Sequence, residues 1–406
     1  MKNVLYISYD GMTDPLGQSQ VLPYLIGLTK NGYTFTILSC EKRDNYVKNR
    51  QVIADILSTA GINWEPIFYT KRPPVLSTLY DYWKLKNAAT KLHNKVKFDI
   101  IHCRSYIASL IGLWMTQKYC LPFVFDMRGF WADERVDGGL WDLSNPIFKT
   151  IYNFFKRKER VFLKKSAAVV SLTHAGKNEI LSWKNLNIPG DKITVIPCCV
   201  DTELFTSEGV SLLQQSAAQQ KLNIGKSDFI LGYLGSIGTW YMLDEMMQFF
   251  ADLKKLIPHA KLLFITQDDA TGIIAKAGVY SIDRTDLIIT PAARNEVPLM
   301  ISLFTYGLFF IKPSYSKTAS SPTKQGEIMA MGLPVICNSG VGDSDAIVEK
   351  YHSGVIVKNF NYSEAITAIL TKQNDFDKNK IRDGAINYFS LSNGIEQYAK
   401  VYQSLK

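Results

Sequence analysis

The sequence predicts an α/β protein built from two tandem doubly wound, Rossmann-like domains. Short apolar runs alternate with amphipathic segments along the chain, which is typical of repeated strand–helix units and parallel sheets. The runs fall into two series, and each series opens with a strand followed by a glycine-bearing turn. Such sheets bind ligands beyond the carboxyl ends of their strands, so we expect two facing domains to form a cleft with one substrate on each side.

Two series of strands and one polar stretch define the expected domains. The first series covers residues 4–9, 34–39, 100–103, 123–126, 168–172 and 193–196, and the second covers residues 229–234, 261–266, 287–290, 307–311, 335–337 and 354–357. Residues 201–228, with a Ser/Gln-rich part at 212–220, are predicted to be a linker with one short helix. We therefore place the first domain at residues 1–200 and the second at 201–387. A C-terminal helix at about 388–406 is expected to pack back onto the first domain.

The composition fits a cytoplasmic enzyme. The 406 residues, 47% hydrophobic and 20% charged, are enough for two cores of ordinary size. The six cysteines show no CxxC spacing, which argues against a disulfide framework or a zinc ribbon and favours a reducing compartment. The chain enters its first strand directly after Met-Lys-Asn, so no signal peptide is expected. Residues 297–311 are too short an apolar stretch to span a bilayer and are predicted to form a helix and then a strand.

The net charge of +9 is unevenly distributed. Residues 1–200 hold 27 Lys and Arg against 16 Asp and Glu, whereas residues 201–406 hold 19 against 21. The basic half should meet an anionic partner. No nucleic-acid-binding signature is present, so a negatively charged membrane face or a lipid-phosphate acceptor fits better. Residues 148–165 mix aromatic and basic side chains, as either an interfacial helix or an ordinary surface helix would.

The most informative stretch covers residues 320–336. Ser320 or Ser321 is expected to cap a helix with Pro322 in its first turn, and Gly332 should end that helix. The first-turn N–H groups, from Thr323 onward, would then form an anion site suited to a phosphate.

Two charged residues of the same helix add to this site. Lys324 contributes a full positive charge beside the first-turn N–H groups. Glu327 lies three residues later on the same face, and its carboxylate could accept hydrogen bonds from a diol such as a ribose. The alternative is a solvent-exposed salt bridge between Lys324 and Glu327.

The two glycine-bearing turns are further candidate ligand loops. In residues 10–20, Gly17 can let a ligand approach the backbone, while Gln18 and Ser19 supply neutral hydrogen bonds at a helix start; a plain long turn is the alternative. The second turn contains Gly235, Ser236, Gly238 and Thr239. Neither loop has the GxGxxG or P-loop pattern, so a nicotinamide or ATP site is not predicted.

A polar cluster follows the predicted strand at residues 123–126. Asp126, Arg128 and Glu134 lie within ten residues of each other at a strand end, which is a favourable place for an active site. A structural ion pair between Asp126 and Arg128 or Arg135 is the alternative. Arg128 stays protonated, so it cannot act as a base but could bind an acceptor phosphate, while Asp126 or Glu134 positions the acceptor hydroxyl.

The preceding predicted strand also ends in polar residues. His102, Arg104 and Ser105 follow the apolar run at residues 100–101 and are second-rank candidates for the same site. His102 is more readily explained as a packed strand residue.

The run Glu-x-Met-Ala-x-Gly-x-Pro-Val-Ile, beginning at Glu327, resembles the donor-nucleotide motif of retaining GT-B glycosyltransferases of family 4. The resemblance implies the GT-B fold and makes Glu327 a ligand of the nucleotide ribose. The family's first Glu, eight residues earlier, is replaced by Ala319, so its donor-sugar contact cannot be transferred to this chain.

Other family motifs are similar but altered. Residues 196–205 resemble the family's interdomain Ile-Pro-Asn-Gly-Val-Asp motif, with Cys-Cys in place of Asn-Gly. The basic pair that usually follows the second glycine turn is missing, since no Lys or Arg lies between Lys226 and Lys254. Lys324 and the loop amides would then neutralise the donor diphosphate, with help from Lys312. Arg128 stands where many members have a histidine that approaches the reacting sugar.

The resemblance implies a hexosyl- or N-acetylhexosaminyl-type glycosyltransferase. It would move a sugar from a UDP- or GDP-linked donor, with retention, to a hydroxyl of a lipid-linked glycan in lipopolysaccharide or capsule synthesis. No metal or other cofactor is expected, because helix-end amides and Lys324 replace a cation. The alternatives are a sugar-nucleotide epimerase and a catalytically silent subunit of a polysaccharide assembly complex. Contact with the anionic inner face of the membrane is expected, and nucleic acid is not.

The site residues are divided among three roles. Those predicted to act in catalysis are Asp126, Arg128 and Glu134. Those predicted to bind the acceptor are Gly17, Gln18, Ser19 and Arg104. Those predicted to bind the nucleotide sugar are Gly235, Ser236, Gly238, Thr239, Arg294, Lys312, Ser321, Thr323, Lys324 and Glu327.

Overall fold

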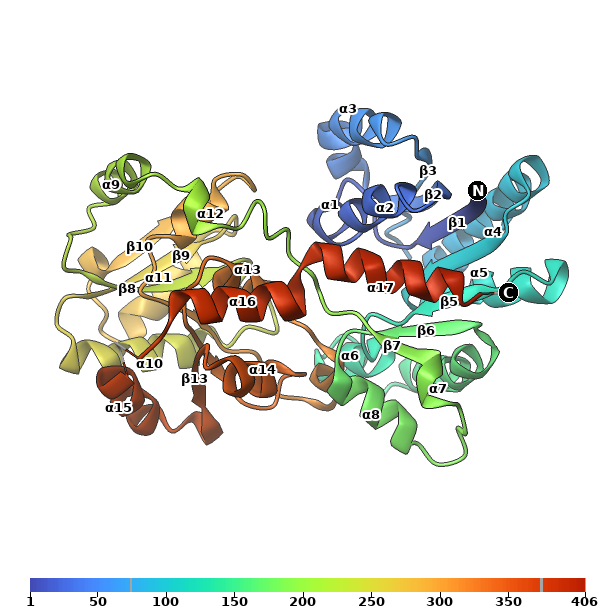
Figure 1. The fold of residues 1–406 in the computed structure, drawn as a ribbon. Helices are drawn as coiled ribbons and strands as arrows, with labels where there is room; N and C mark the ends of the chain where they lie inside the picture. Colours follow the sequence, from blue (N-terminus) through green and yellow to red (C-terminus); the bar gives the residue numbers. More distant parts are fainter. Residues whose placement is uncertain (74, 373–374, 406) are drawn as a thin grey trace. The chain divides into compact units, whose positions relative to one another are not determined.

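The structure, a computed structural model, describes residues 1–73, 75–372 and 375–405. The chain forms two compact units (Figure 1). The first contains residues 1–197 together with 391–405, and the second is Cys198–Ser390. Each unit has its own parallel sheet flanked by helices, so the predicted architecture of two tandem α/β domains is confirmed.

The sheet of the first unit has seven strands within the described residues, all parallel, in the order β3-β2-β1-β4-β5-β6-β7. The strands are β1 (Lys2–Ser8), β2 (Tyr33–Glu41), β3 (Asn63–Phe68), β4 (Ile100–Arg104), β5 (Phe123–Asp126), β6 (Ala168–Ser171) and β7 (Ile193–Val195). The helices are α1 (Pro15–Gln20), α2 (Leu22–Thr29), α3 (Arg43–Thr59), α4 (Leu76–Val96), α5 (Ser105–Tyr119), α6 (Trp131–Asp137), α7 (Pro146–Lys165), α8 (His174–Ser182) and α17 (Leu391–Gln403).

The sheet of the second unit has six parallel strands within the described residues, in the order β10-β9-β8-β11-β12-β13. They are β8 (Phe229–Leu234), β9 (Ala260–Ile265), β10 (Leu287–Thr290), β11 (Tyr306–Phe309), β12 (Val335–Asn338) and β13 (Gly354–Val357). The helices are α9 (Leu212–Lys221), α10 (Leu243–Leu256), α11 (Ala270–Val279), α12 (Val297–Ile301), α13 (Thr323–Ala330), α14 (Ser344–Tyr351), α15 (Tyr362–Lys372) and α16 (Lys378–Phe389).

One strand was not predicted. β3 lies at the edge of the first sheet and pairs only with β2, so its side chains are mostly half-buried or exposed. Pro66 in its middle removes a backbone donor, which an edge strand tolerates but which argues against a strand in the sequence. Without an apolar run, the strand gave no signal of its own.

The strand order determines which loops are available to ligands. β1 lies between β2 and β4, and β8 lies between β9 and β11, so the direction of winding reverses at both strands. In doubly wound sheets, ligands bind beside the carboxyl end of the strand at such a switch point. The two glycine-bearing turns that follow β1 and β8 therefore occupy the favoured positions of their sheets.

The C-terminal helix α17 belongs to the first unit and packs against α2 (Figure 1). A Cβ atom added to Gly27 of α2 would lie 2.2 Å from Cδ1 of Ile395, so the glycine permits a close approach of the two helices. The buried ring of Tyr402 contacts Tyr33 and Phe35 of β2. These contacts bring tyrosines from the end of the chain to the first sheet.

Helix α7 covers most of the basic and aromatic stretch at residues 148–165. Its Phe155, Phe162 and Leu163 are buried, so its main apolar face packs on the first unit. This packing is what the alternative of an ordinary surface helix predicts, and contact of its exposed side with lipid stays a prediction. None of the helices in the described ranges is both long and apolar enough to cross a membrane.

Candidate functional site

A short backbone bridge positions the loop that follows β8. The Lys312 N–H donates to the Trp240 carbonyl oxygen at 2.9 Å, the Met242 N–H donates to Phe310 at 3.0 Å, and Tyr241 forms an antiparallel bridge with Ile311. The two consecutive aromatic residues 240 and 241 are thus fixed beside the chain that leaves β11. Their rings hold two lysines.

The first lysine is Lys324, in the first turn of α13. Its side chain is buried, and Nζ donates to the Tyr233 hydroxyl at 2.9 Å and lies 3.5 Å from the centroid of the Tyr241 ring. A Cβ atom on Gly235 would lie 3.5 Å from Nζ, so the loop backbone runs close to the ammonium. Burial lowers the pKa of Lys324 well below its usual range, and the Glu327 carboxylate opposes this shift.

The second lysine, Lys317, was not predicted. It lies in the 3-10 turn Tyr315–Ala319, is buried, and places Nζ 3.7 Å from the centroid of the Trp240 ring. Lys312, which we expected to assist, is exposed. The available signal for Lys317 was its place in the same polar run as Lys324, but the run does not show that a Trp side chain would meet it.

Glu327 has a different partner from Lys324. Its buried carboxylate forms an ion pair with the guanidinium of Arg294, which also lies 4.6 Å over the Phe205 ring. Burial raises the pKa of Glu327, while Arg294 and Lys324 lower it. The alternative of a solvent-exposed salt bridge between Lys324 and Glu327 is therefore wrong, because both side chains are buried and each has its own partner.

The start of α13 differs from the expectation. Its N-cap residue is Pro322, and no side chain caps the helix. The Ser321 hydroxyl instead accepts a hydrogen bond from the Cys198 N–H at 3.1 Å, so it serves a neighbouring loop. The predicted serine cap is wrong, while the end of the helix before Gly332, at φ +73°, is confirmed. A helix start without a side-chain cap leaves room for an anion near its first amides, beginning at Thr323.

The rest of the loop after β8 is fixed at two points. The Tyr233 hydroxyl donates to the carbonyl oxygen of Ser236, and the Ile237 N–H donates to Asp268 at 2.6 Å. Gly235 has φ +108°, a conformation that strongly favours glycine. Beyond these points Gly238 and Thr239 are exposed. The loop thus presents backbone and small side chains beside Lys324.

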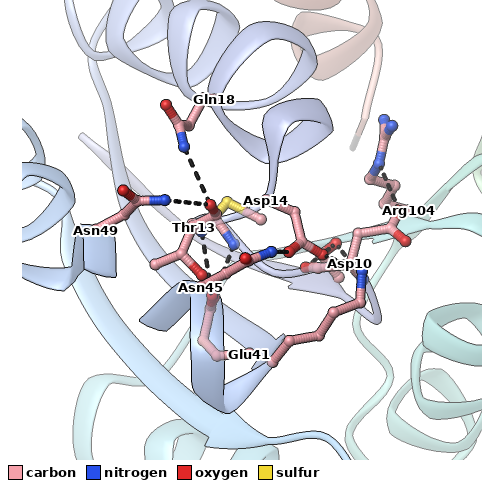
Figure 2. Close-up of polar contacts among 11 residues, drawn as sticks. Asp10, Thr13, Asp14, Gln18, Glu41, Asn45, Asn49 and Arg104 are labelled. Carbon is pink, nitrogen blue, oxygen red and sulfur yellow. Dashed lines mark hydrogen bonds and ion pairs between the residues drawn. The ribbon is translucent and has the colours of Figure 1, made fainter. Parts of the chain in front are cut away.

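In the first unit, the carboxylate of Glu41 organises the glycine-bearing loop after β1 (Figure 2). It accepts hydrogen bonds from the N–H groups of Met12 at 2.7 Å and Thr13 at 3.1 Å, and from the hydroxyls of Thr13 at 2.5 Å and Ser39 at 2.6 Å. This carboxylate is fully buried, and four donors satisfy it. The buried carboxylate therefore holds the loop after β1 in one conformation.

The three expected acceptor residues of this loop all make local contacts. Figure 2 shows Gln18 and Asn49 converging on the Thr13 carbonyl, with hydrogen bonds of 3.0 and 3.1 Å. The Ser19 hydroxyl donates to Pro15 within α1. A Cβ atom on Gly17 would lie 2.2 Å from the Gly11 carbonyl oxygen, so this glycine is required by packing within the loop. Their role toward an acceptor stays a prediction.

The second polar cluster of this unit surrounds Asp126 at the end of β5. Its Oδ2 accepts from the Tyr398 hydroxyl of α17 at 3.1 Å and lies 3.4 Å from Nε2 of His102. Nδ1 of His102 lies 2.6 Å from the Tyr402 hydroxyl. Burial lowers the pKa of His102, although Asp126 opposes the shift, so the imidazole is mostly neutral at neutral pH. His102 is a packed strand residue, and it belongs to this network.

Two arginines lie beside the same carboxylate. Arg128, at φ +55°, places Nη1 4.0 Å from Oδ1 of Asp126, and Arg104 donates from Nε to Asp10 at 3.3 Å. Burial alone would raise the pKa of Asp126, but Arg128, His102 and Arg104 together lower it. Among the described residues, Oδ1 of Asp126 and Nη1 of Arg104 are buried without a hydrogen-bond partner. These two atoms have hydrogen-bonding capacity that the described residues do not use.

Glu134 stands apart from these buried groups. It is half-buried in the first turn of α6, whereas its neighbour Asp133 is buried and accepts from Tyr152 at 2.8 Å and Lys156 at 2.7 Å. The structure therefore brings Asp126, Arg128 and Arg104 together, with Glu134 further along the same segment. Within the described ranges, no group of three or more His, Cys, Asp or Glu side chains could hold a metal ion.

Two family descriptions match this chain and together cover most of it. Residues 21–204 match Glycosyltransferase Family 4, and residues 214–384 match Glycosyl transferases group 1. No curated protein matches the sequence. The chain belongs to the family 4 glycosyltransferases and is a nucleotide-sugar-dependent glycosyltransferase with the GT-B fold.

Solved structures agree with this fold at low sequence identity. A glycosyltransferase from Rickettsia africae is 16% identical with a TM-score of 0.72, covering 99% of this chain and 98% of the other. HepE from Anabaena, in complex with UDP and glucose, is 13% identical with a TM-score of 0.72 and full coverage of both chains. A sucrose-phosphate synthase from Thermosynechococcus elongatus is 14% identical with a TM-score of 0.74, covering 99% and 98%.

Burial of the Lys324 ammonium gives a testable dependence of stability on pH. The folded-state pKa lies below the ordinary lysine value of 10.5, so the charged side chain costs stability below the folded pKa. That cost decreases as the pH rises toward the unfolded value. We expect Lys324→Met to be more stable than the wild type at neutral pH, with a gap that narrows toward pH 10.5 in urea unfolding.

A matched control for this measurement is Lys71→Met, because Lys71 is exposed. Its free energy of unfolding should stay within about 0.5 kcal/mol of the wild type. A Lys324→Met protein that is less stable than the wild type at neutral pH would contradict the argument. The aromatic rings and the Tyr233 hydroxyl would then outweigh the cost of burial.

Proposed function

We propose that the second unit binds a UDP- or GDP-linked sugar and that Lys317 and Lys324 neutralise its diphosphate. The observation that carries this proposal is the burial of both lysines against Trp240 and Tyr241, at the carboxyl edge of the sheet. An ammonium is costly to bury, and the buried Lys324 ammonium, with the Lys317 ammonium held beside the same loop, favours an anionic ligand. They take the place of the basic pair that the loop itself lacks.

The remaining donor contacts follow from the same elements. The exposed part of the loop at Gly238 and Thr239 and the first amides of α13 supply neutral hydrogen bonds to phosphate oxygens. The Glu327 carboxylate accepts from the ribose diol, and Arg294 holds it ionised. HepE, solved in complex with UDP and glucose, has the same fold and supports a nucleotide sugar as the donor.

The acceptor side is proposed for the first unit, at Asp126, Arg128 and Arg104. Oδ1 of Asp126 and Nη1 of Arg104 have no hydrogen-bond partner among the described residues, so an acceptor hydroxyl and an anionic group could satisfy them. The guanidinium of Arg128 would bind such an anion through its planar fork. Glu134 and the loop at Gly17, Gln18 and Ser19 would contact the rest of the acceptor.

The reaction joins the acceptor oxygen to the anomeric carbon and releases the nucleoside diphosphate. The leaving group gains negative charge as the glycosidic bond breaks through an oxocarbenium-like state, so the two lysines stabilise the transition state more than the ground state. Family membership supports retention of configuration. We further propose a lipid-linked glycan as acceptor, in cell-surface polysaccharide synthesis at the cytoplasmic face of the membrane, because the first half of the chain is basic.

A donor screen tests the function as a whole. The purified protein is incubated with a panel of UDP- and GDP-sugars and a pool of lipid-linked acceptors, and the products are analysed by mass spectrometry. Transfer from one donor is the expected result. Conversion of a donor in the absence of acceptor would instead indicate an epimerase, and donor binding without any turnover would indicate a silent subunit.

Removing the Glu327 carboxylate should weaken nucleotide binding. Glu327→Ala should lose roughly 1.5 to 3 kcal/mol of UDP or GDP affinity, the range for hydrogen bonds to a charged group. Isothermal titration calorimetry measures this, and Glu349→Ala, at an exposed site, is the matched control. Unchanged affinity of a folded Glu327→Ala protein would show that the ribose assignment is wrong.

The two buried lysines should act on the diphosphate and not on the nucleoside. Lys317→Ala and Lys324→Ala are each expected to lose roughly 1.5 to 3 kcal/mol of affinity for UDP, with little change for uridine. Lys312→Ala, at an exposed lysine of the same strand end, is the control and should bind UDP normally. Equal losses for UDP and uridine would place the mutated lysine outside the phosphate site.

Arg128→Lys should affect the use of the acceptor and leave donor binding unchanged. It keeps the positive charge but removes the planar fork, so transfer should fall while donor affinity stays within about twofold, under about 0.5 kcal/mol. Steady-state kinetics with each substrate varied in turn measures both effects, and Arg135→Lys on α6 is the control. Weakened donor binding with a normal acceptor dependence would reverse the assignment of this cluster.

A further inference from the structure

The first two turns of α4 expose a stripe of large apolar side chains. Leu76, Leu79, Tyr80 and Trp83 are 62%, 58%, 53% and 57% exposed, and their spacing of i, i+3, i+4 and i+7 puts them on one face of the helix. The rings of Tyr80 and Trp83 stack with centroids 6.1 Å apart. We call these four residues the α4 stripe.

The opposite face of α4 packs against the first unit, and this packing keeps the α4 stripe exposed. Ser77, Asp81, Leu85 and Ala89 are buried, and the Asp81 carboxylate accepts hydrogen bonds from the Tyr9 hydroxyl and the Thr70 N–H, both at 3.0 Å. The helix is therefore anchored to the first unit by its other side. The exposure of the α4 stripe is a feature of a packed helix, since a rotation would expose Leu85 and break the contacts of Asp81.

Basic residues are frequent in the sequence on both sides of the α4 stripe. Residues 69–97 contain seven Lys or Arg and one acidic residue, Asp81, so most of the charge excess of the first half lies here. Lys71 and Arg72, just before the helix, are exposed, as are Lys91 and Lys95 further along it. The Asp81 carboxylate is buried and paired with Lys84 at 2.7 Å, so it does not offset the exposed charges.

Helix α7, for which an interfacial and an ordinary surface helix were both left open by the sequence, has a different environment. Its Phe155, Phe162 and Leu163 are buried, as described above, and several of its basic groups already have partners. Lys156 pairs with Asp133 and Glu159, the Arg160 guanidinium donates to the Lys184 carbonyl at 2.9 Å, and Lys164 donates to Asn185 at 3.1 Å. Helix α4 differs in that its four exposed large apolar side chains lie on one face, with exposed Lys and Arg residues before and after them in the sequence.

We propose that the α4 stripe and its surrounding Lys and Arg residues dock the protein on a bilayer with anionic headgroups. An exposed helix face with Leu, Tyr and Trp, preceded and followed in the sequence by exposed Lys and Arg, fits the interface between headgroups and acyl chains, where Tyr and Trp are enriched. Each basic residue near an anionic surface adds electrostatic attraction. This inference deepens the membrane contact of the proposed function and rests on it for the lipid-linked acceptor.

The test uses the full-length protein and vesicles of equal parts phosphatidylglycerol and phosphatidylcholine. The wild type should sediment with them and less with pure phosphatidylcholine, and binding should weaken with added NaCl, because exposed charges are screened within about 8 Å at physiological ionic strength. Leu79→Gln combined with Trp83→Gln should lower the partition coefficient about tenfold or more, because two apolar side chains no longer enter the interface.

A matched control places the same change on α7. Ile147 and Phe154 are 61% and 40% exposed, and their double replacement by Gln should leave vesicle binding unchanged. A second measurement locates Trp83 directly. Phospholipids brominated along their acyl chains should quench part of the tryptophan fluorescence of the wild type, and Trp83→Phe should bind normally but lose that part of the quenching.

Three results would overturn the proposal. These are no binding of the wild type to the anionic vesicles, equal binding by the α4 and α7 double variants, and self-association of the wild type that the α4 double variant abolishes. The last result would identify a second copy of the chain as the occupant. UDP affinity and transfer to a short water-soluble acceptor should be normal in the α4 double variant. Failure of those two assays in the wild type would count against the proposed function and leave the vesicle result standing.

Discussion

The arrangement of the second unit's candidate site depends on the burial of two lysine ammoniums against aromatic rings. A buried ammonium loses its water, so its neighbours must supply other stabilising contacts. Trp240 faces Lys317, Tyr241 faces Lys324, and the Tyr233 hydroxyl accepts from Lys324. The bridge of residues 240–242 with 310–312 and the left-handed conformation of Gly235 are what bring the loop this close. In the proposed function, a diphosphate would bind beside two amine groups whose positions are already set, with little reorganisation.

In the first unit, two buried carboxylates have opposite roles. Glu41 accepts four hydrogen bonds and holds the loop after β1, so its capacity is used within the protein. Asp126 is bonded on one oxygen only, and its other oxygen faces Arg128 at 4.0 Å. The Glu41 carboxylate fixes the loop after β1. The Asp126 carboxylate can still accept a hydrogen bond from a ligand. The tyrosines that orient Asp126 and His102 come from α17, so the C-terminal segment contributes to this site in a direct way.

Similar compositions on α4 and α7 lead to different roles. Both helices mix aromatic, aliphatic and basic residues, and α7 has the stronger amphipathic pattern. That pattern is strong because α7 covers the unit's core with Phe155 and Phe162. On α4 the packing face consists of small or polar residues with Leu85, which leaves the bulky apolar residues outward. An amphipathic pattern therefore indicates that a helix has an apolar and a polar face. It does not show which face packs against the rest of the protein.

The sequence by itself determined the two tandem parallel sheets, nearly all of their strands, and the importance of Lys324 and Glu327, because alternating apolar runs and a local helix pattern are written in neighbouring residues. Only the tertiary structure decided the partners. Lys317 contacts Trp240, Arg294 pairs with Glu327, and Tyr398 bonds to Asp126, although the partners are 77, 33 and 272 residues apart in the sequence. Such contacts depend on which strand ends are adjacent in a sheet. Edge strand β3 was missed for a related reason, since its pairing with β2 is not visible in its own residues.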